Sequence, residues 1–159
     1  MLEGIGEDLT REGLKDTPRR VAEMCEEIFA GLSKDASLEI GFSEEVGEGD
    51  LIRIKDIAFY SVCEHHLLPF FGKVDILYAP QNNHVAGFSD IAKIVDTYAQ
   101  RPQIQERLGR QIAGEMMRSL KPAGVMVKIE ATQLCASMRG RHKKEMVTVT
   151  EVMRGKLPE

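Results

Sequence analysis

The fold of this chain is decided by residues 51–79, which read LIRIKDIAFYSVCEHHLLPFFGKVDILYA. Apolar residues alternate with polar ones in residues 51–59 and again in residues 72–79. A period of two is typical of β-strands that have one buried face. We therefore expect two strands, joined by a short connection that carries Cys63-Glu64-His65-His66.

Cys63 and His66 are typical zinc ligands, and Cys135 offers a third ligand far downstream. Structural zinc sites usually hold the ion with four Cys or His ligands, whereas catalytic sites use three and keep the fourth position open. No zinc-finger spacing fits these three residues. The pattern favours a catalytic zinc site; the alternative is that Cys63 and Cys135 are small core residues on neighbouring strands.

Length and composition fit a small soluble enzyme. A chain of 159 residues suits one domain with a real core. The formal net charge of −4 and the pI near 5.6 argue against nucleic acid as the main partner. We find no apolar run long enough for a membrane span and no signal peptide. The three cysteines suit a reducing compartment, so we expect a cytoplasmic protein with no membrane partner.

The rest of the chain alternates between helical and strand-like patterns. The expected order is helix, two strands, two helices, two strands, with helices at residues 16–31, 89–101 and 103–120, a loop at 34–50, and later strands at 125–135 and 147–149. Cys25 lies on the apolar face of the first helix and is expected to be a core thiol. Cys63 and Cys135 lie near the ends of two strands and can converge if those strands are neighbours.

Five runs of the sequence are characteristic of one known family. They are Tyr60-Ser61-Val62-Cys63-Glu64-His65-His66-Leu67-Leu68-Pro69-Phe70-Phe71-Gly72-Lys73, Arg101-Pro102-Gln103-Ile104-Gln105-Glu106-Arg107-Leu108, Glu130-Ala131-Thr132-Gln133-Leu134-Cys135, Asp16-Thr17-Pro18-Arg19-Arg20-Val21-Ala22 and Met138-Arg139-Gly140. These runs resemble GTP cyclohydrolase I, and the resemblance covers nearly the whole chain.

The resemblance implies an α+β tunnelling fold. Its parts are a four-stranded antiparallel sheet, two helices on one face of the sheet, and an N-terminal helix. We expect residues 1–159 to form a single domain of this kind, from which the family's leading N-terminal helix is missing. The family also implies a homo-oligomer, typically a decamer, with active sites between subunits, and such assembly would cover the edges of the sheet.

By resemblance, Cys63, His66 and Cys135 are the ligands of Zn²⁺. The family's reaction opens the imidazole ring of GTP at C8 with a zinc-activated water, releases formate and yields dihydroneopterin triphosphate. His65 matches the proton-transfer histidine of the family. The alternative is that His65 is itself a zinc ligand or only contacts the ligands. Gln105 and Glu106 match the residues that bind the guanine base, because a carboxylate can accept from N1–H and the exocyclic amine together. Without the surrounding motif, Glu106 would be read as a surface charge.

Two parts of the expected site depart from the family. The family has His-x-Cys where this chain has Gln133, and a carboxamide cannot transfer a proton near neutral pH. In the phosphate site, Ser89 is followed by Asp90 where a basic residue is common, and Lys93 replaces a common arginine. Glu23 occupies a position where bacterial relatives often have lysine, and two carboxylates would repel a triphosphate unless they point into solvent.

Several basic residues remain as candidates for the phosphate or ribose side. They are Arg20, Lys93 and Arg139, with Arg141 and Lys143 as additional candidates.

Three functions are consistent with this sequence. The first is a GTP cyclohydrolase I that tolerates the substitutions. The second is a divergent paralogue that hydrolyses another guanine-type purine without the triphosphate, or that stops at a ring-opened formamide. The third is a non-catalytic oligomer that binds a purine or pterin. The open zinc position and His65 favour an enzyme, and GTP is the expected substrate.

Overall fold

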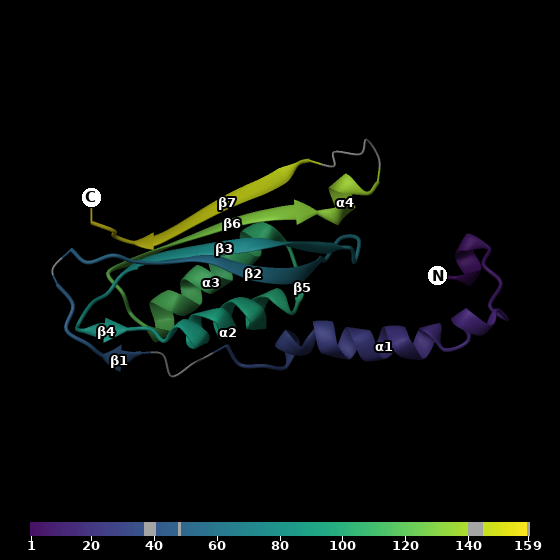
Figure 1. Ribbon diagram of the computed structural model, residues 1–159, viewed down its shortest axis with the longest axis horizontal. Helices are drawn as coiled ribbons and strands as arrows, with labels where there is room; N and C mark the ends of the chain where they lie inside the picture. Colours follow the sequence, from purple (N-terminus) through teal and green to yellow (C-terminus); the bar gives the residue numbers. More distant parts are fainter. Residues whose placement is uncertain (37–40, 48, 140–144, 159) are drawn as a thin grey trace.

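A computed structural model describes residues 1–36, 41–47, 49–139 and 145–158 (Figure 1). The helices are η1 (Glu3–Ile5), η2 (Glu12–Leu14), α1 (Thr17–Ile28), η3 (Ala30–Leu32), α2 (Phe88–Ala99), α3 (Gln105–Ser119) and α4 (Leu134–Ser137), where η denotes a 3₁₀ turn. The strands are β1 (Phe42–Ser43), β2 (Ile52–Cys63), β3 (Pro69–Ala79), β4 (His84–Val85), β5 (Pro102–Gln103), β6 (Gly124–Gln133) and β7 (Val147–Gly155).

The main sheet has the strand order β5-β2-β3-β6-β7. Its four long strands are antiparallel, as expected, and the fifth strand, β5, pairs in parallel with the end of β2. The expected count of four strands is therefore one too low. The additional strand, β5, is only two residues long and contains Pro102, a residue type that usually interrupts regular structure. A second small sheet, β1 with β4, lies partly in the segment expected to be a loop.

Helices α2 and α3 cover one face of the sheet (Figure 1). Their inward residues recur at helical spacing and are fully buried, as are the inward residues of the central strands. The largest of these side chains are Tyr78, Phe70, Ile76, Ile91, Ile94, Leu108, Ile112, Met116 and Ile129. Burial of each large apolar side chain contributes roughly 1.5–3 kcal/mol relative to exposure. This shared core fixes the start of α3 against the ends of the strands, where the candidate site lies.

The other face of the sheet is charged. Lys73 Nζ lies 2.7 Å from Asp56 Oδ1, and the Asp56 N–H donates to Asp75 Oδ1 at 2.9 Å. Asp56 has a φ of 60° and lies in a β-bulge between Ile54 and Ile57. The bulge inserts one extra residue, so both isoleucines still face the core although they are three positions apart.

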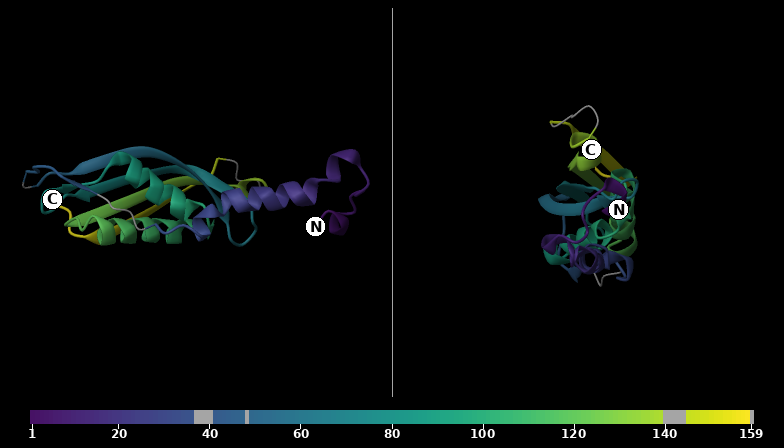
Figure 2. Two further views of the ribbon diagram at one scale, coloured as in Figure 1. Left: turned by 90° about the horizontal axis from the view of Figure 1, so that it is seen from below. Right: turned by 90° about the vertical axis from the view of Figure 1, so that its right-hand side faces the viewer.

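Helix α1 extends away from the sheet and the two covering helices (Figure 2). None of its residues is buried, and Val21 and Met24 are 42% and 48% exposed. The expectation that Cys25 is a core thiol is therefore wrong for this chain, because the apolar face of α1 does not pack on the sheet; Cys25 is only half-buried. Within the part of the chain that is described, no helix has both the length and the apolar character needed to cross a membrane.

Candidate metal centre and adjoining pocket

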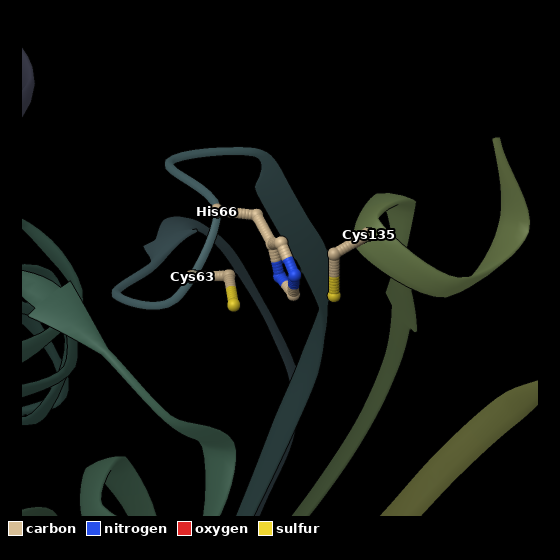
Figure 3. Close-up of side chains that lie close together, drawn as sticks. All are labelled: Cys63, His66 and Cys135. Carbon is tan, nitrogen blue, oxygen red and sulfur yellow. The ribbon is translucent and has the colours of Figure 1, made fainter. Parts of the chain in front are cut away.

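Cys63, His66 and Cys135 come together at one end of the sheet (Figure 3). Cys63 is the last residue of β2, His66 lies in the turn to β3, and Cys135 lies in α4, directly after β6. Their ligand atoms lie within 4.8 Å of one another. The strands β2 and β6 are not neighbours, because β3 lies between them, so the group converges without direct pairing of the two strands. The turn that carries His66 reaches past the start of β3 and closes this gap.

The turn that follows Cys63 is held by its own backbone. The Cys63 N–H donates to the Leu68 carbonyl oxygen at 2.8 Å, and the Leu67 N–H donates to the Cys63 carbonyl oxygen at 2.9 Å. Leu67 has a φ of 52°, a left-handed conformation that is uncommon for residues other than glycine. The tight turn directs the side chains of Cys63 and His66 toward the same point (Figure 3).

The donor set fits a borderline divalent metal such as zinc. Zinc–sulfur bonds of about 2.3 Å and zinc–nitrogen bonds of about 2.0 Å place tetrahedral ligand atoms about 3.5–3.8 Å apart, so a small closure would complete the site. Burial raises the pKa of the Cys135 thiol, and the neighbouring Cys63 raises it further. A bound cation would reverse this effect by favouring both thiolates. Among the described residues, no fourth Cys, His, Asp or Glu joins the group.

His65 lies beside this group without belonging to it. Its side chain is 63% exposed, and its Nδ1 lies 3.7 Å from Cys63 Sγ. The rings of His65 and His66 are 6.2 Å apart between centroids. An exposed imidazole next to a metal group can accept or donate a proton at the mouth of the site.

A pocket of about 200 Å³ adjoins the group formed by Cys63, His66 and Cys135, called the metal group below. It is lined by Cys63, His65, Gln103, Ile104, Gln105, Glu106, Gln133, Cys135 and Thr148. Glu106 lies in the first turn of α3 and is exposed, so its carboxylate is available to a ligand. Pockets for small molecules usually measure about 300–1,000 Å³. This one is large enough for part of a nucleotide and too small for a whole nucleoside triphosphate.

Gln105 ties the wall of the pocket to the sheet. Its Nε2 donates to the carbonyl oxygens of Ile129 at 3.0 Å and Thr148 at 2.9 Å, with a longer contact of 3.4 Å to Thr150 Oγ1. Its Oε1 accepts from Gln133 Nε2 at 2.8 Å. Gln105 is only 3% exposed. The first residue of α3 is therefore fixed to β6 and β7, and Glu106 is carried with it.

A second connection, which was not predicted from the sequence, joins α3 to the turn between β2 and β3 that carries Glu64 and His66. Arg107 Nη2 donates to Glu64 Oε1 at 3.0 Å, and its Nη1 donates to Glu64 Oε2. The hydrogen bond to Arg107 holds the pKa of Glu64 below its ordinary value. The Glu64 N–H also donates to the Gln103 carbonyl oxygen at 2.9 Å. The sequence held one clue to this ion pair, because each partner is adjacent to a predicted site residue. Glu64 lies between Cys63 and His65, and Arg107 follows Glu106.

Comparisons with known proteins show the family of this chain. The family model for GTP cyclohydrolase I matches residues 1–159. The chain is 54% identical over 157 residues to GTP cyclohydrolase 1 of Carboxydothermus hydrogenoformans, a match that covers 98% of this chain and 81% of the relative. It is 50% identical over 159 residues to the same enzyme of Finegoldia magna, which covers 100% of this chain and 86% of the relative.

The chain belongs to the GTP cyclohydrolase I family. The resemblance inferred from the five sequence motifs is thereby confirmed, and the family is one of enzymes. Among solved structures, the archaeosine synthase QueF-Like in its apo form matches with a TM-score of 0.56 at 20% identity, over 68% of this chain and 96% of that protein. This match supports the α+β tunnelling fold alone.

Arg20, Ser89 and Lys93, which the family resemblance suggested for the phosphate or ribose side, are not among the described residues that line this pocket. Ser89 and Lys93 lie in the first half of α2, and the other end of that helix leads to β5 beside Cys63. A helix of 12 residues is about 18 Å long. Arg20 lies on α1, the helix that extends away from the sheet. Arg139 is exposed, two residues beyond α4, and Arg141 and Lys143 lie outside the described residues.

Each of the two unexpected acidic residues has a cationic neighbour. Asp90 Oδ1 lies 3.6 Å from Lys93 Nζ, and Glu23 Oε1 lies 2.7 Å from Arg19 Nη1. Asp90 therefore partly neutralises one of the lysines expected to bind phosphate. The helix expected at residues 89–101 begins at Phe88 with Gly87 as its N-cap residue, so Ser89 lies inside α2.

Proposed function

We propose that this chain is a zinc-dependent hydrolase that opens the imidazole ring of a guanine-type purine at C8, with GTP as the expected substrate. The observation that carries the proposal is the group of three metal ligands beside a pocket whose wall includes the free carboxylate of Glu106. The names of the relatives, GTP cyclohydrolase 1, support the same reaction.

Cys63, His66 and Cys135 would hold the zinc ion, which supplies a Lewis acid and lowers the pKa of a water near C8. His65 is proposed to remove a proton from that water and to return one to the leaving nitrogen. In the ring opening, the water oxygen adds to C8 and one of the water protons goes to N7; the bond between C8 and N9 then breaks, and N9 receives the second proton. The product of this step is a formamide.

Glu106 is proposed to orient the base. Its carboxylate can accept from N1–H and from the exocyclic amine of guanine, whereas adenine lacks the N1–H. Gln105 belongs to the same subsite because it lines the pocket and fixes the start of α3. The bidentate contact between Arg107 and Glu64 fixes α3 relative to the turn between β2 and β3.

The later steps are where two enzyme functions diverge. A complete GTP cyclohydrolase I reaction would hydrolyse the formamide, release formate and close a new ring to give dihydroneopterin triphosphate. Gln133 cannot transfer a proton, and Asp90 reduces the positive charge expected at the phosphates. These two residues favour the second candidate, a divergent enzyme that stops at the formamide or that acts on a purine without the triphosphate.

We also propose that residues 1–159 act as one domain of a homo-oligomer, with a decamer as the expected size. Arg20, Ser89 and Lys93 would then complete the site of another copy, and the exposed apolar face of α1 would be covered. Arg139 would serve the site of its own copy, because its charge already acts on the nearby Cys135 thiol. The three free cysteines suit the cytoplasm. A non-catalytic binder is disfavoured, because it has no need of an open metal position.

Mass spectrometry of products tests this proposal. Zinc-loaded protein is incubated separately with GTP, guanosine and oxidised guanine nucleosides. Conversion of GTP to dihydroneopterin triphosphate identifies the complete reaction. Accumulation of a formamide, or turnover of a nucleoside alone, identifies the divergent enzyme. Unchanged purines throughout, with tight binding of one of them, would leave only the binding oligomer.

A further inference from the structure

The amide of Gln105 has a fixed orientation. Its Nε2 donates to two backbone carbonyl oxygens, those of Ile129 and Thr148. A carbonyl oxygen can only accept, so the flipped amide would place the Gln105 oxygen against two other acceptors. Because Gln105 is 3% exposed, water could not relieve that conflict. The Oε1 of Gln105 must therefore face Gln133.

The orientation of Gln105 determines the orientation of Gln133. Gln105 Oε1 accepts from Gln133 Nε2 at 2.8 Å, and the flipped Gln133 amide would bring two carbonyl oxygens together at that distance. Gln133 lines the pocket and is half-buried. No hydrogen bond among the described residues reaches its Oε1. The free polar atom of Gln133 is therefore an acceptor.

Another acceptor lies at the same pocket. Glu106 contributes an exposed carboxylate. Gln103 also lines the pocket, but its Oε1 is buried and is not exposed to a ligand. The wall of the pocket is therefore better suited to a ligand that presents several hydrogen-bond donors than to one that presents acceptors.

We propose that the Oε1 of Gln133 is a specificity determinant that selects a purine with an N–H on its imidazole edge. This inference rests on the proposed function, which places the guanine donors on Glu106 and the imidazole edge toward the metal group. On that edge, an intact guanine presents N7, which can only accept. An 8-oxo purine presents N7–H, and a ring-opened purine presents the N–H of its formamide. The site should hold either of these more tightly than guanine itself.

Isothermal titration calorimetry with three nucleosides tests the proposal. Position 7 is an acceptor in guanosine, a C–H group in 7-deazaguanosine and an N–H donor in 8-oxoguanosine. We expect the zinc-loaded protein to bind 8-oxoguanosine about ten- to a hundred-fold more tightly than guanosine, with 7-deazaguanosine between them. The metal-free protein should keep the same order, because the preference arises from Gln133 and not from the metal.

The variant Gln133→Met removes the acceptor and keeps a long side chain, and it should reduce the preference to about threefold or less. Gln133→Leu provides a second apolar replacement, and circular dichroism together with zinc content shows which variants are folded. Gln100→Met is the matched control, because Gln100 lies at the end of α2 and does not line this pocket. It should leave the preference unchanged.

An equal preference in the unmodified protein and in both Gln133 variants would overturn the inference. If the preference is equal but Glu106→Gln weakens binding of the nucleosides, the inference about Gln133 fails and the proposed function stands. If no nucleoside binds, or if Glu106→Gln has no effect on binding, the proposed function fails as well.

Discussion

The variant Gln105→Leu removes the side chain that links α3 to the sheet. In the unmodified protein this amide donates to the Ile129 and Thr148 carbonyl oxygens and accepts from Gln133 Nε2, at distances between 2.8 and 3.0 Å. Each neutral hydrogen bond contributes about 0.5–1.5 kcal/mol net, so three of them contribute roughly 1.5–4.5 kcal/mol. The contact of 3.4 Å to Thr150 Oγ1 is too long to add much.

Leucine replaces the amide with an apolar group of similar size. The Ile129 and Thr148 carbonyl oxygens and Gln133 Nε2 then lose the hydrogen bonds that they form with Gln105. We expect the free energy of unfolding to fall by about 3 kcal/mol. For a domain of this length, a loss of that size lowers the Tm by about 6–12 °C. Differential scanning fluorimetry of the zinc-loaded protein measures the change. Gln100→Leu is the control at the glutamine that follows α2; it loses only an exposed hydrogen bond from Lys34 Nζ, so it should change stability by no more than about 0.5 kcal/mol.

Gln105→Leu should also weaken binding of guanosine, because Glu106 is carried by the turn that Gln105 holds. The reasoning is refuted if the Tm changes no more than in the Gln100 control while guanosine binding is also unchanged. A loss of stability without any loss of guanosine binding would mean that Gln105 supports the fold and does not position Glu106.

Three other variants test separate parts of the site. Glu106→Gln should lower kcat/KM for a guanine-type substrate by about ten- to a hundred-fold while zinc stays bound, since one charged hydrogen bond is lost. Arg107→Leu releases Glu64 and should lower kcat with zinc content unchanged, whereas Arg110→Leu, an exposed arginine of the same helix, should have no effect on kcat. Asp90→Lys should improve binding of GTP relative to guanosine, because an attractive charge replaces a repulsive one; equal gains for both ligands, measured by calorimetry, would show that Asp90 does not face the phosphates.

Much of the fold could be predicted because the sequence pattern and the packing agree. Ile91, Ile94 and Val95 recur at helical spacing and are fully buried in α2. The alternation in residues 72–79 likewise predicts β3, although the strand begins earlier, at Pro69. Such patterns report which face of an element is buried, and that is enough to fix the type of each element.

The sequence could not predict features that depend on contacts between distant segments. Strand β5 exists only because Pro102 and Gln103 lie beside Val62 and Cys63. The apolar face of α1 has the same spacing as a buried helix, yet it is exposed in a single copy of the chain.

The candidate site also combines features that could be predicted from residue types with features that depend on contacts between distant segments. The three candidate metal ligands could be chosen from residue chemistry and family resemblance, and the structure brings them together across an intervening strand. The chain of hydrogen bonds through Gln105 to Gln133 could not be predicted, because it depends on one backbone carbonyl group of β6 and one of β7, and backbone carbonyl groups are the same in every residue type. The expected phosphate residues have the right chemistry, but a single copy does not place Ser89 and Lys93 at the pocket.

The most direct test of hydrolysis at C8 is the fate of water oxygen. Zinc-loaded protein is incubated with GTP and with guanosine in ¹⁸O-labelled water, and the products are identified by mass spectrometry. We predict ¹⁸O in the formyl group of a ring-opened product or in released formate, and no such product from Cys63→Ser. Intact, unlabelled purines after incubation with the folded, zinc-loaded protein would contradict the account.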